Sequence, residues 1–356
     1  MKTEIVKKLI QRIIEIEPNQ SPLISCFVNL DQARANYFSE IEGKARLISK
    51  RLTGDRLADF EDALSEIKDY LASDLKPSSK SVAIYARWGD HPIVLPVQFE
   101  VPMATEFIVD SLPHIYPIVE LKDTYHRFVT VITTETEARI FETTIGSVTE
   151  EIFAERPELR ERIGREWTRE HYHNHKSERE QQFVKDKIRI IENLMSRSGH
   201  NHLVIAGSPK MASRLTNTLP QRLRDKLITT VPMNPNSGLS PILTEAIQLF
   251  TAAENIESHD HVATLEAEFL RHSLGVAGYE ASKKALMGGY ADMLIIDQDF
   301  TEIELREELI RLASASGVRI ETVKRSESLE RLSGVGCLLR YRPDRGAPAS
   351  LSRHAA

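Results

Sequence analysis

Residues 279–297 read YEASKKALMGGYADMLIID and carry the clearest fold signal in the chain. The residues up to Gly289 predict a helix that this glycine ends, and the apolar run at 291–297 predicts a buried strand. Further apolar and amphipathic runs follow at 304–317, 318–323 and 334–341. Helices that alternate with strands in this way predict an α/β/α sandwich for the last domain, residues 237–345.

The preceding segment, residues 122–236, shows a different order of elements. Three β-rich runs come first, followed by a helix whose apolar stripe includes Phe183 and Ile191. A short buried strand and a helix that begins near Pro209 follow. The strands are expected at 127–134, 137–144, 147–154 and 202–207. The order β-β-β-α-β predicts a mixed sheet flanked by helices, as in ribonuclease H-like domains.

The first 121 residues predict an α/β domain. An amphipathic helix opens the chain, and a long helical segment at 34–75 is expected to divide at Gly54. Strands are expected at 23–30, 81–87 and 91–99, the last two joined by a hairpin turn at Gly89-Asp90. Prolines then recur at Pro102, Pro113 and Pro117. The tail, residues 346–356, is expected to be disordered.

Composition excludes several classes of protein. The chain has 356 residues, 41% of them hydrophobic and 28% charged, with a net charge of −6. These values predict an ordinary globular protein of two or three domains. No run approaches the ~20 apolar residues of a membrane helix, and the N-terminus is unlike a signal peptide. Two distant cysteines, Cys26 and Cys337, predict neither a disulfide framework nor a zinc site, which fits a cytoplasmic protein.

A cationic segment rich in histidine and aromatic residues is the strongest candidate site. Over residues 156–189, ten lysines and arginines face seven acidic residues, which gives a local charge of +3 in an acidic chain. Cations hold phosphates and planar rings stack on bases, so this composition favours RNA binding. The candidate RNA-contacting residues are Arg165, Trp167, Arg169, His171, Tyr172, His173, His175 and Lys176. The plainer alternative is a solvated loop and helix face with interleaved charges.

A metal site is the competing interpretation of the same histidines. His171, His173 and His175 could ligate zinc if the segment is extended, and His171 with His175 could do so if it is helical. No cysteine lies nearby and no HExxH motif is present, so no metal or other cofactor is predicted. The pairs His200/His202 and His259/His261 are more typical of loops and strand ends.

Enzyme signatures are largely missing. Two-metal nuclease chemistry needs clustered carboxylates, whereas the first strand of the middle segment, RFVTVITT, has none. Glu135 and Glu137 fall in the following turn, and Glu142 lies on the next strand. The chain contains no GxSxG, Walker or GxGxxG motif. A small basic run, LPQRLRDK at 219–226, fits either a polyanion contact or a surface loop.

The stretch at 279–297 and the sequence LSGVGCLLRY at 332–341 resemble the third domain of the archaeo-eukaryotic release factor and Pelota family. LPQRL at 219–223 is similar in character to the bacterial branch, which includes the ribosome-hibernation factor Balon. The resemblance spans residues 123–341. It implies a three-domain, tRNA-shaped protein that binds the ribosomal A site. It also implies a third domain that contacts a translational GTPase such as elongation factor Tu.

One departure from the family bears directly on activity. True release factors carry Gly-Gly-Gln on a loop of the middle domain before a basic helix, and this chain has no such tripeptide. The matching place, residues 164–177, reads GREWTREHYHNHKS and precedes a helix expected near Ser177. The resemblance therefore implies a non-catalytic factor for ribosome hibernation or rescue, whose loop 165–176 contacts rRNA. The alternatives are a peptidyl-tRNA hydrolase, nuclease or metal-dependent hydrolase that uses this loop, and a stress-linked protein adaptor.

Overall fold

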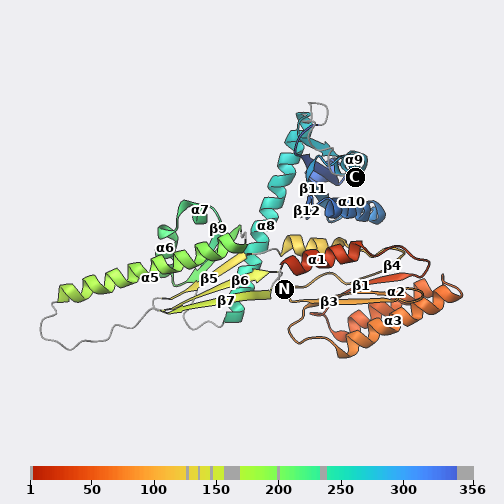
Figure 1. The fold of residues 1–356 in the computed structure, drawn as a ribbon, viewed down its shortest axis with the longest axis horizontal. Helices are drawn as coiled ribbons and strands as arrows, with labels where there is room; N and C mark the ends of the chain where they lie inside the picture. Colours follow the sequence, from red (N-terminus) through yellow and green to blue (C-terminus); the bar gives the residue numbers. More distant parts are fainter. Residues whose placement is uncertain are drawn as a thin grey trace, which may run out of the picture. The chain divides into compact units, whose positions relative to one another are not determined.

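The computed structural model describes residues 3–125, 128–134, 137–144, 147–155, 169–198, 201–232 and 239–342. The chain forms two compact units (Figure 1). The middle unit comprises Tyr125–Ala253, together with the first residues of the chain. The flanking unit comprises Glu4–Thr124 and the chain from Glu254 onward. The described residues form three sheets, one in each of the three predicted segments, and the architecture is mixed α/β as expected.

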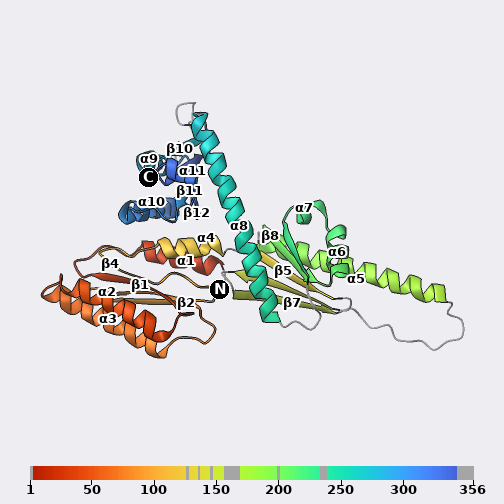
Figure 2. The same ribbon diagram turned by 180° about the vertical axis from the view of Figure 1, so that it is seen from behind.

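Sheet A, in the flanking unit, is antiparallel with the order β3-β2-β1-β4. Its strands are β1 (Leu23–Asn29), β2 (Ser81–Arg87), β3 (Ile93–Phe99) and β4 (Glu106–Asp110). Helices α2 (Arg34–Ser49) and α3 (Asp55–Ser73) cover one face, and α1 (Thr3–Ile14) and α4 (Tyr116–Thr124) cover the other (Figures 1 and 2). The predicted division of the long helix at Gly54 is confirmed, and that glycine has a φ of 59°.

Regular elements form in the proline-spaced segment. β4 lies between Pro102 and Pro113, and α4 begins at Tyr116. Pro117 is the second residue of α4, and proline is tolerated in the first turn because its missing N–H has no intrahelical acceptor there. The residues on either side, including Ile115 and Ile118, are fully buried, so burial stabilises this helix.

Sheet B, in the middle unit, has the order β7-β6-β5-β8-β9. Its strands are β5 (Phe128–Thr133), β6 (Glu137–Thr144), β7 (Ser147–Glu155), β8 (His202–Gly207) and β9 (Leu227–Pro232). The first three are antiparallel, whereas β8 and β9 run parallel to β5. This is the ribonuclease H-like arrangement that the sequence predicts, extended by the unpredicted strand β9.

Helices cover both faces of sheet B. One face packs against α5 (Arg169–Ser198), α6 (Pro209–Thr218) and α7 (Gln221–Arg224) through a core that includes Ile191 and Leu215. The other face packs against the first turns of α8 (Leu239–Leu270), where the rings of Phe250 and Phe128 stack 4.5 Å apart. The middle unit is therefore a three-layer sandwich.

Sheet C, in the flanking unit, has the order β10-β13-β11-β12, with only β11 and β12 parallel. Its strands are β10 (Gly275–Ala277), β11 (Ala291–Asp297), β12 (Arg319–Val323) and β13 (Val335–Leu339). Val262 and Leu265 of α8 share one core with Met293 and Ile295. Helices α9 (Tyr279–Met287), α10 (Ile303–Ala315) and α11 (Glu327–Arg331) complete the α/β/α sandwich that the sequence predicts.

The two cysteines are free and buried, Cys26 in sheet A and Cys337 in sheet C. Burial raises the pKa of each thiol to about 12, so neither is a reactive thiolate near neutral pH. The expectation that they form no disulfide is confirmed. None of the helices described above has the unbroken apolar length that crossing a bilayer requires.

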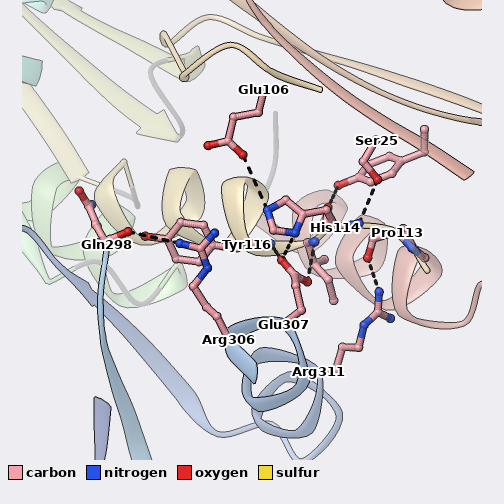
Figure 3. Close-up of polar contacts among 11 residues, drawn as sticks. Ser25, Glu106, Pro113, His114, Tyr116, Gln298, Arg306, Glu307 and Arg311 are labelled. Carbon is pink, nitrogen blue, oxygen red and sulfur yellow. Dashed lines mark hydrogen bonds and ion pairs between the residues drawn. The ribbon is translucent and has the colours of Figure 1, made fainter. Parts of the chain in front are cut away.

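Helix α4 joins the two halves of the flanking unit (Figure 3). At its beginning, the backbone N–H groups of Ile115 and Tyr116 each donate to the Glu307 carboxylate of α10 at 2.9 Å. A carboxylate at this position satisfies helix donors that have no intrahelical acceptor. Nδ1 of His114 lies 2.5 Å from the same carboxylate.

Further contacts hold the rest of α4. The Arg306 guanidinium lies 3.7 Å from the centre of the Tyr116 ring, a cation–π geometry that Figure 3 shows. Arg311 donates to the carbonyl of Pro113. Near the end of the helix, Asp123 accepts from the backbone N–H of Thr322 at 2.6 Å and from its hydroxyl at 2.9 Å. Because β12 is an edge strand, the Asp123 side chain also accepts from a backbone N–H, that of Thr322, which has no partner strand on that side of sheet C.

Candidate nucleic-acid interface

Six of the eight predicted RNA-contacting residues lie in a helix. Arg165 and Trp167 fall outside the described residues, and α5 begins at Arg169. The expectation of a loop over 169–176 and of a helix start near Ser177 is therefore wrong. Residues 171–175 have only moderate helix propensity, but no glycine or proline lies between Arg169 and Ser177, so nothing ends the helix there. The site itself stays a prediction.

The helical backbone decides between the two geometries considered for the histidines. Positions 171 and 175 are four residues apart and share a face, whereas position 173 is two residues from each and falls on a different face. A three-histidine zinc site needs an extended segment. The helical structure is compatible only with the two-histidine form of the metal hypothesis, which uses His171 and His175.

The first turns of α5 project from the middle unit. The predicted stripe of Phe183, Val184, Ile188 and Ile191 is buried against sheet B, which confirms that half of the helix. Glu178 and the residues up to Gln182 are exposed where their side chains are described. Figures 1 and 2 show the beginning of α5 extending past the ends of the sheet B strands. Positions 169–176 therefore stand away from the body of their own unit.

A buried lysine lies at the end of sheet B where β5 and β8 finish. β5 and β8 end side by side, with Thr133 opposite Gly207. Lys187 of α5 is 1% exposed, and its Nζ donates to the Thr133 hydroxyl at 2.5 Å and to the Thr134 carbonyl at 3.4 Å. Neither strand carries an acidic residue, and no cluster of three carboxylates forms here among the described residues. The middle unit thus lacks the two-metal arrangement in its described part.

The basic run at 219–226 serves the fold. Arg222 forms an ion pair with Glu192 of α5 at 2.6 Å. Arg224 donates to the carbonyls of Asn217 and Leu219, which end α6. Of the two interpretations, these contacts favour the surface-loop one.

A second basic surface, which the sequence did not suggest, lies at the tip between α2 and α3. Residues 44–56 contain five cations against a single acid, Asp55. Lys44 pairs with Glu40 at 2.9 Å. The other four, Arg46, Lys50, Arg51 and Arg56, are exposed and form no ion pair with a described carboxylate. The helix break at Gly54 brings them to one turn, a signal that a count of charge around this glycine would have found. We call these four residues the basic tip.

Among the described residues, the remaining histidine pairs form no cluster of three metal ligands inside a single unit. His259 is exposed, and Nδ1 of His261 lies 3.4 Å from the Glu321 carboxylate. A hydrogen bond to Glu321 raises the pKa of His261 despite its partial burial. The ring of His202 packs 5.4 Å from that of Phe250, and His200 lies outside the described residues.

Comparison with solved structures gives distant likenesses. The archaeal Pelota in a model of ribosome-bound Pelota and ABCE1 is 13% identical, covers 96% of each chain and has a TM-score of 0.47. Dom34 of S. cerevisiae is 14% identical over 74% of this chain and 82% of its own, with a TM-score of 0.42. Pelota of Archaeoglobus fulgidus is 15% identical over 73% and 80%, with a TM-score of 0.36. No curated protein matches the chain.

The family comparison is more direct. Residues 113–250 match the family model described as bacterial archaeo-eukaryotic release factor family 10. The matched segment begins just before α4, contains all of sheet B and ends in α8. The resemblance predicted from the sequence is thereby confirmed over residues 113–250, the segment that this release-factor family model matches.

Proposed function

We propose that the chain is a translation factor that binds the ribosomal A site without hydrolysing peptidyl-tRNA, in hibernation or rescue. One observation carries the proposal: a release-factor segment at 113–250 in a chain that has no Gly-Gly-Gln. Release factors need that tripeptide to place water at the peptidyl ester. A family member without it keeps the means to bind and lacks this means of catalysis.

Two basic surfaces support binding to rRNA. In the middle unit, the first turns of α5 carry Arg169 and Lys176 away from sheet B, with Arg165 just before them in the sequence. In the flanking unit, the basic tip offers four exposed cations that no described carboxylate neutralises. Contacts of this kind hold phosphates and position a protein on RNA without reading sequence. Trp167, Tyr172 and the three histidines would add stacking and hydrogen bonds.

Partners and location follow from this proposal. The ribosome and its rRNA are the main partners, and a translational GTPase such as elongation factor Tu would deliver the protein. The site of action is the cytoplasm. The absence of a carboxylate cluster near Lys187, in the described part of the middle unit, argues against the nuclease alternative.

The test is co-sedimentation of the purified full chain with bacterial ribosomes over a salt series, with and without tRNA in the A site. We expect saturable binding that A-site tRNA abolishes. Replacing Arg165, Arg169 and Lys176 by Glu should weaken binding. It should also reduce the steepness of log K plotted against log salt concentration by about 2, because up to three phosphate contacts are lost. The matched control reverses Arg12, Arg325 and Arg331, three exposed cations far from α5 in the sequence.

The outcomes separate the alternatives. Binding that is unchanged in the α5 variant removes those residues from the interface, and a Lys50→Glu, Arg51→Glu variant then tests the basic tip. Equal weakening by the control variant would mean that only net charge matters. No binding under any condition contradicts the proposed function.

A further inference from the structure

One edge of sheet C collects exposed apolar side chains. Leu270 and Met287 are each 69% exposed, and Leu274 and Tyr341 are 37% and 38% exposed. They make up half of the eight large apolar side chains that are exposed in the described parts of the chain. Exposed apolar side chains that gather in one place mark interaction surfaces, whereas scattered ones need no explanation.

The topology brings these four residues to the same edge. β10 and β11 are both antiparallel to β13, so β10 and β11 begin at the edge where β13 ends. Leu274 directly precedes β10, and its carbonyl accepts from the Leu339 N–H at 2.8 Å. Tyr341 follows β13, and its ring lies 6.5 Å from that of Tyr290, directly before β11. We call Leu270, Leu274, Met287 and Tyr341 the amino edge of sheet C.

Helices deliver the other two members. α8 packs on one face of sheet C through Leu265 and ends at Leu270. α9 ends at Met287, three residues before Tyr290. The amino edge therefore runs from the end of one helix, across two strand ends, to the end of another.

The turn between α8 and β10 is held in a fixed shape. The Glu268 carboxylate accepts from the Leu274 N–H at 3.0 Å, and Arg342 donates from Nε to the Ser273 carbonyl at 2.6 Å. His272 in this turn has a φ of 51°. Because these contacts order the turn, Leu270 and Leu274 are presented without a further folding cost when a partner binds.

Cations outnumber carboxylates around the amino edge. Arg271 is 73% exposed and lies 3.7 Å from Oε1 of Glu268, while Oε2 of the same carboxylate accepts from the Leu274 N–H. Arg340 shares the single carboxylate of Asp292 with Arg319, at 3.4 and 3.0 Å. Lys284 on α9 is exposed and Arg342 follows Tyr341 directly. The rim is therefore positive, which is complementary to acidic groups.

We propose that the amino edge of sheet C is a docking surface for a protein segment that combines large apolar side chains with Asp and Glu. Apolar contact with Leu270, Leu274 and Met287 would supply affinity, and the basic rim would select acidic sequences. A strand of RNA would use the cations and leave the aliphatic side chains in water, so a protein partner accounts for more of the surface. The proposal is independent of ribosome binding by the middle unit.

The test is selection of random displayed peptides on the full chain, followed by affinity measurement with synthetic peptides. We expect enriched sequences to combine Leu, Ile or Phe with Asp and Glu. The variant Leu270→Ser, Met287→Ser should bind them about tenfold more weakly. The matched control is Ile256→Ser, because Ile256 is 67% exposed on the same helix α8 and lies outside the amino edge.

A charge variant protects the test against a folding defect. If the double serine variant does not keep the thermal midpoint of the unaltered chain, Arg271→Glu with Arg340→Glu decides, and it should lose the acidic peptides. The proposal is overturned if no peptide is enriched, or if the enriched peptides are basic. Equal binding by the variants and the control, or displacement of the peptides by poly(U) RNA, overturns it as well.

Discussion

The Glu307 carboxylate of α10 lies 2.5 Å from Nδ1 of His114 and also accepts the two backbone N–H groups that open α4. One side chain from the C-terminal part of the chain thus satisfies three donors of the N-terminal part. Burial opposes ionisation of Glu307, but these hydrogen bonds outweigh it and hold its pKa below the usual range. These charge-assisted hydrogen bonds connect α10 to the start of α4 within the flanking unit.

Glu307→Gln should lower the stability of the flanking unit by about 1–3 kcal/mol at neutral pH, because the donors lose a charged acceptor. Because the pKa of Glu307 is lower in the folded state than in the unfolded state, its ionised form contributes stability at any pH above the unfolded-state pKa. That contribution is lost as the pH falls through the folded-state pKa. Thermal unfolding from about pH 7 to about pH 3 should therefore show the two proteins converging in acid. Glu304→Gln, on an exposed position of the same helix, is the control and should change little. A constant difference across this range contradicts the charge-based account.

Asp123 has the opposite pH dependence. Burial, and secondarily the charge of Glu321, raise its pKa to about 8, although Thr322 donates two hydrogen bonds to it. Because the pKa of Asp123 is higher in the folded state, its protonated form contributes stability. This contribution is fully present when the pH is below the unfolded-state pKa, near 3.8, and is lost as the pH rises through about 8. The oxygen of an Asn side chain can accept the same two bonds without a charge.

Asp123→Asn should therefore stabilise the protein by about 2 kcal/mol at alkaline pH and have almost no effect in acid. Thermal midpoints over a pH series check this, with Asp299→Asn as the control because Asp299 is 71% exposed. A variant that is less stable than the unaltered chain at every pH would show that the negative charge itself holds β12.

The sequence predicts strands best where an apolar run is bounded by turn residues. The strands at 81–87, 137–144, 202–207 and 291–297 have the predicted bounds. β9 was not predicted, because Thr229 and Thr230 interrupt its short apolar run LITTVP, which is fixed by pairing with β8. β4 was not predicted for a similar reason, since it is fixed by pairing with β1.

Contacts between distant parts of the chain were beyond sequence reasoning. Glu307 and His114 are separated by nearly two hundred positions, and neither stands out as part of a local pattern. The charge of Lys187 suggested an exposed helix face, whereas the structure buries it beneath the end of β5. The basic tip depends on the turn at Gly54, which folds four cations of two successive helices together.

Lys187 should be important for the stability of the middle unit. Its Nζ donates to Thr133 and Thr134 and lies 4.0 Å from the centre of the Phe183 ring. Lys187→Ala should cost about 2–4 kcal/mol, because it leaves a cavity and polar groups without their donor. Lys187→Met keeps most of the volume and should cost less. Lys185→Ala, exposed on the same helix, should change stability by under about 0.5 kcal/mol in urea unfolding. Equal effects at the two positions would contradict the buried role of Lys187.

The histidines of α5 should not hold a structural metal. A helix places positions 171 and 175 on one face and position 173 on another, so at most two imidazoles meet, whereas structural zinc takes four protein ligands. Elemental analysis of the purified chain should therefore find well under one zinc per chain. Replacing His171, His173 and His175 by Ala should leave that content and the thermal midpoint unchanged, while it weakens ribosome binding if the imidazoles face rRNA. Stoichiometric zinc that disappears in this variant would instead favour the metal-dependent hydrolase, and a hydrolysis assay on peptidyl-tRNA with the zinc-loaded chain would then be the deciding measurement.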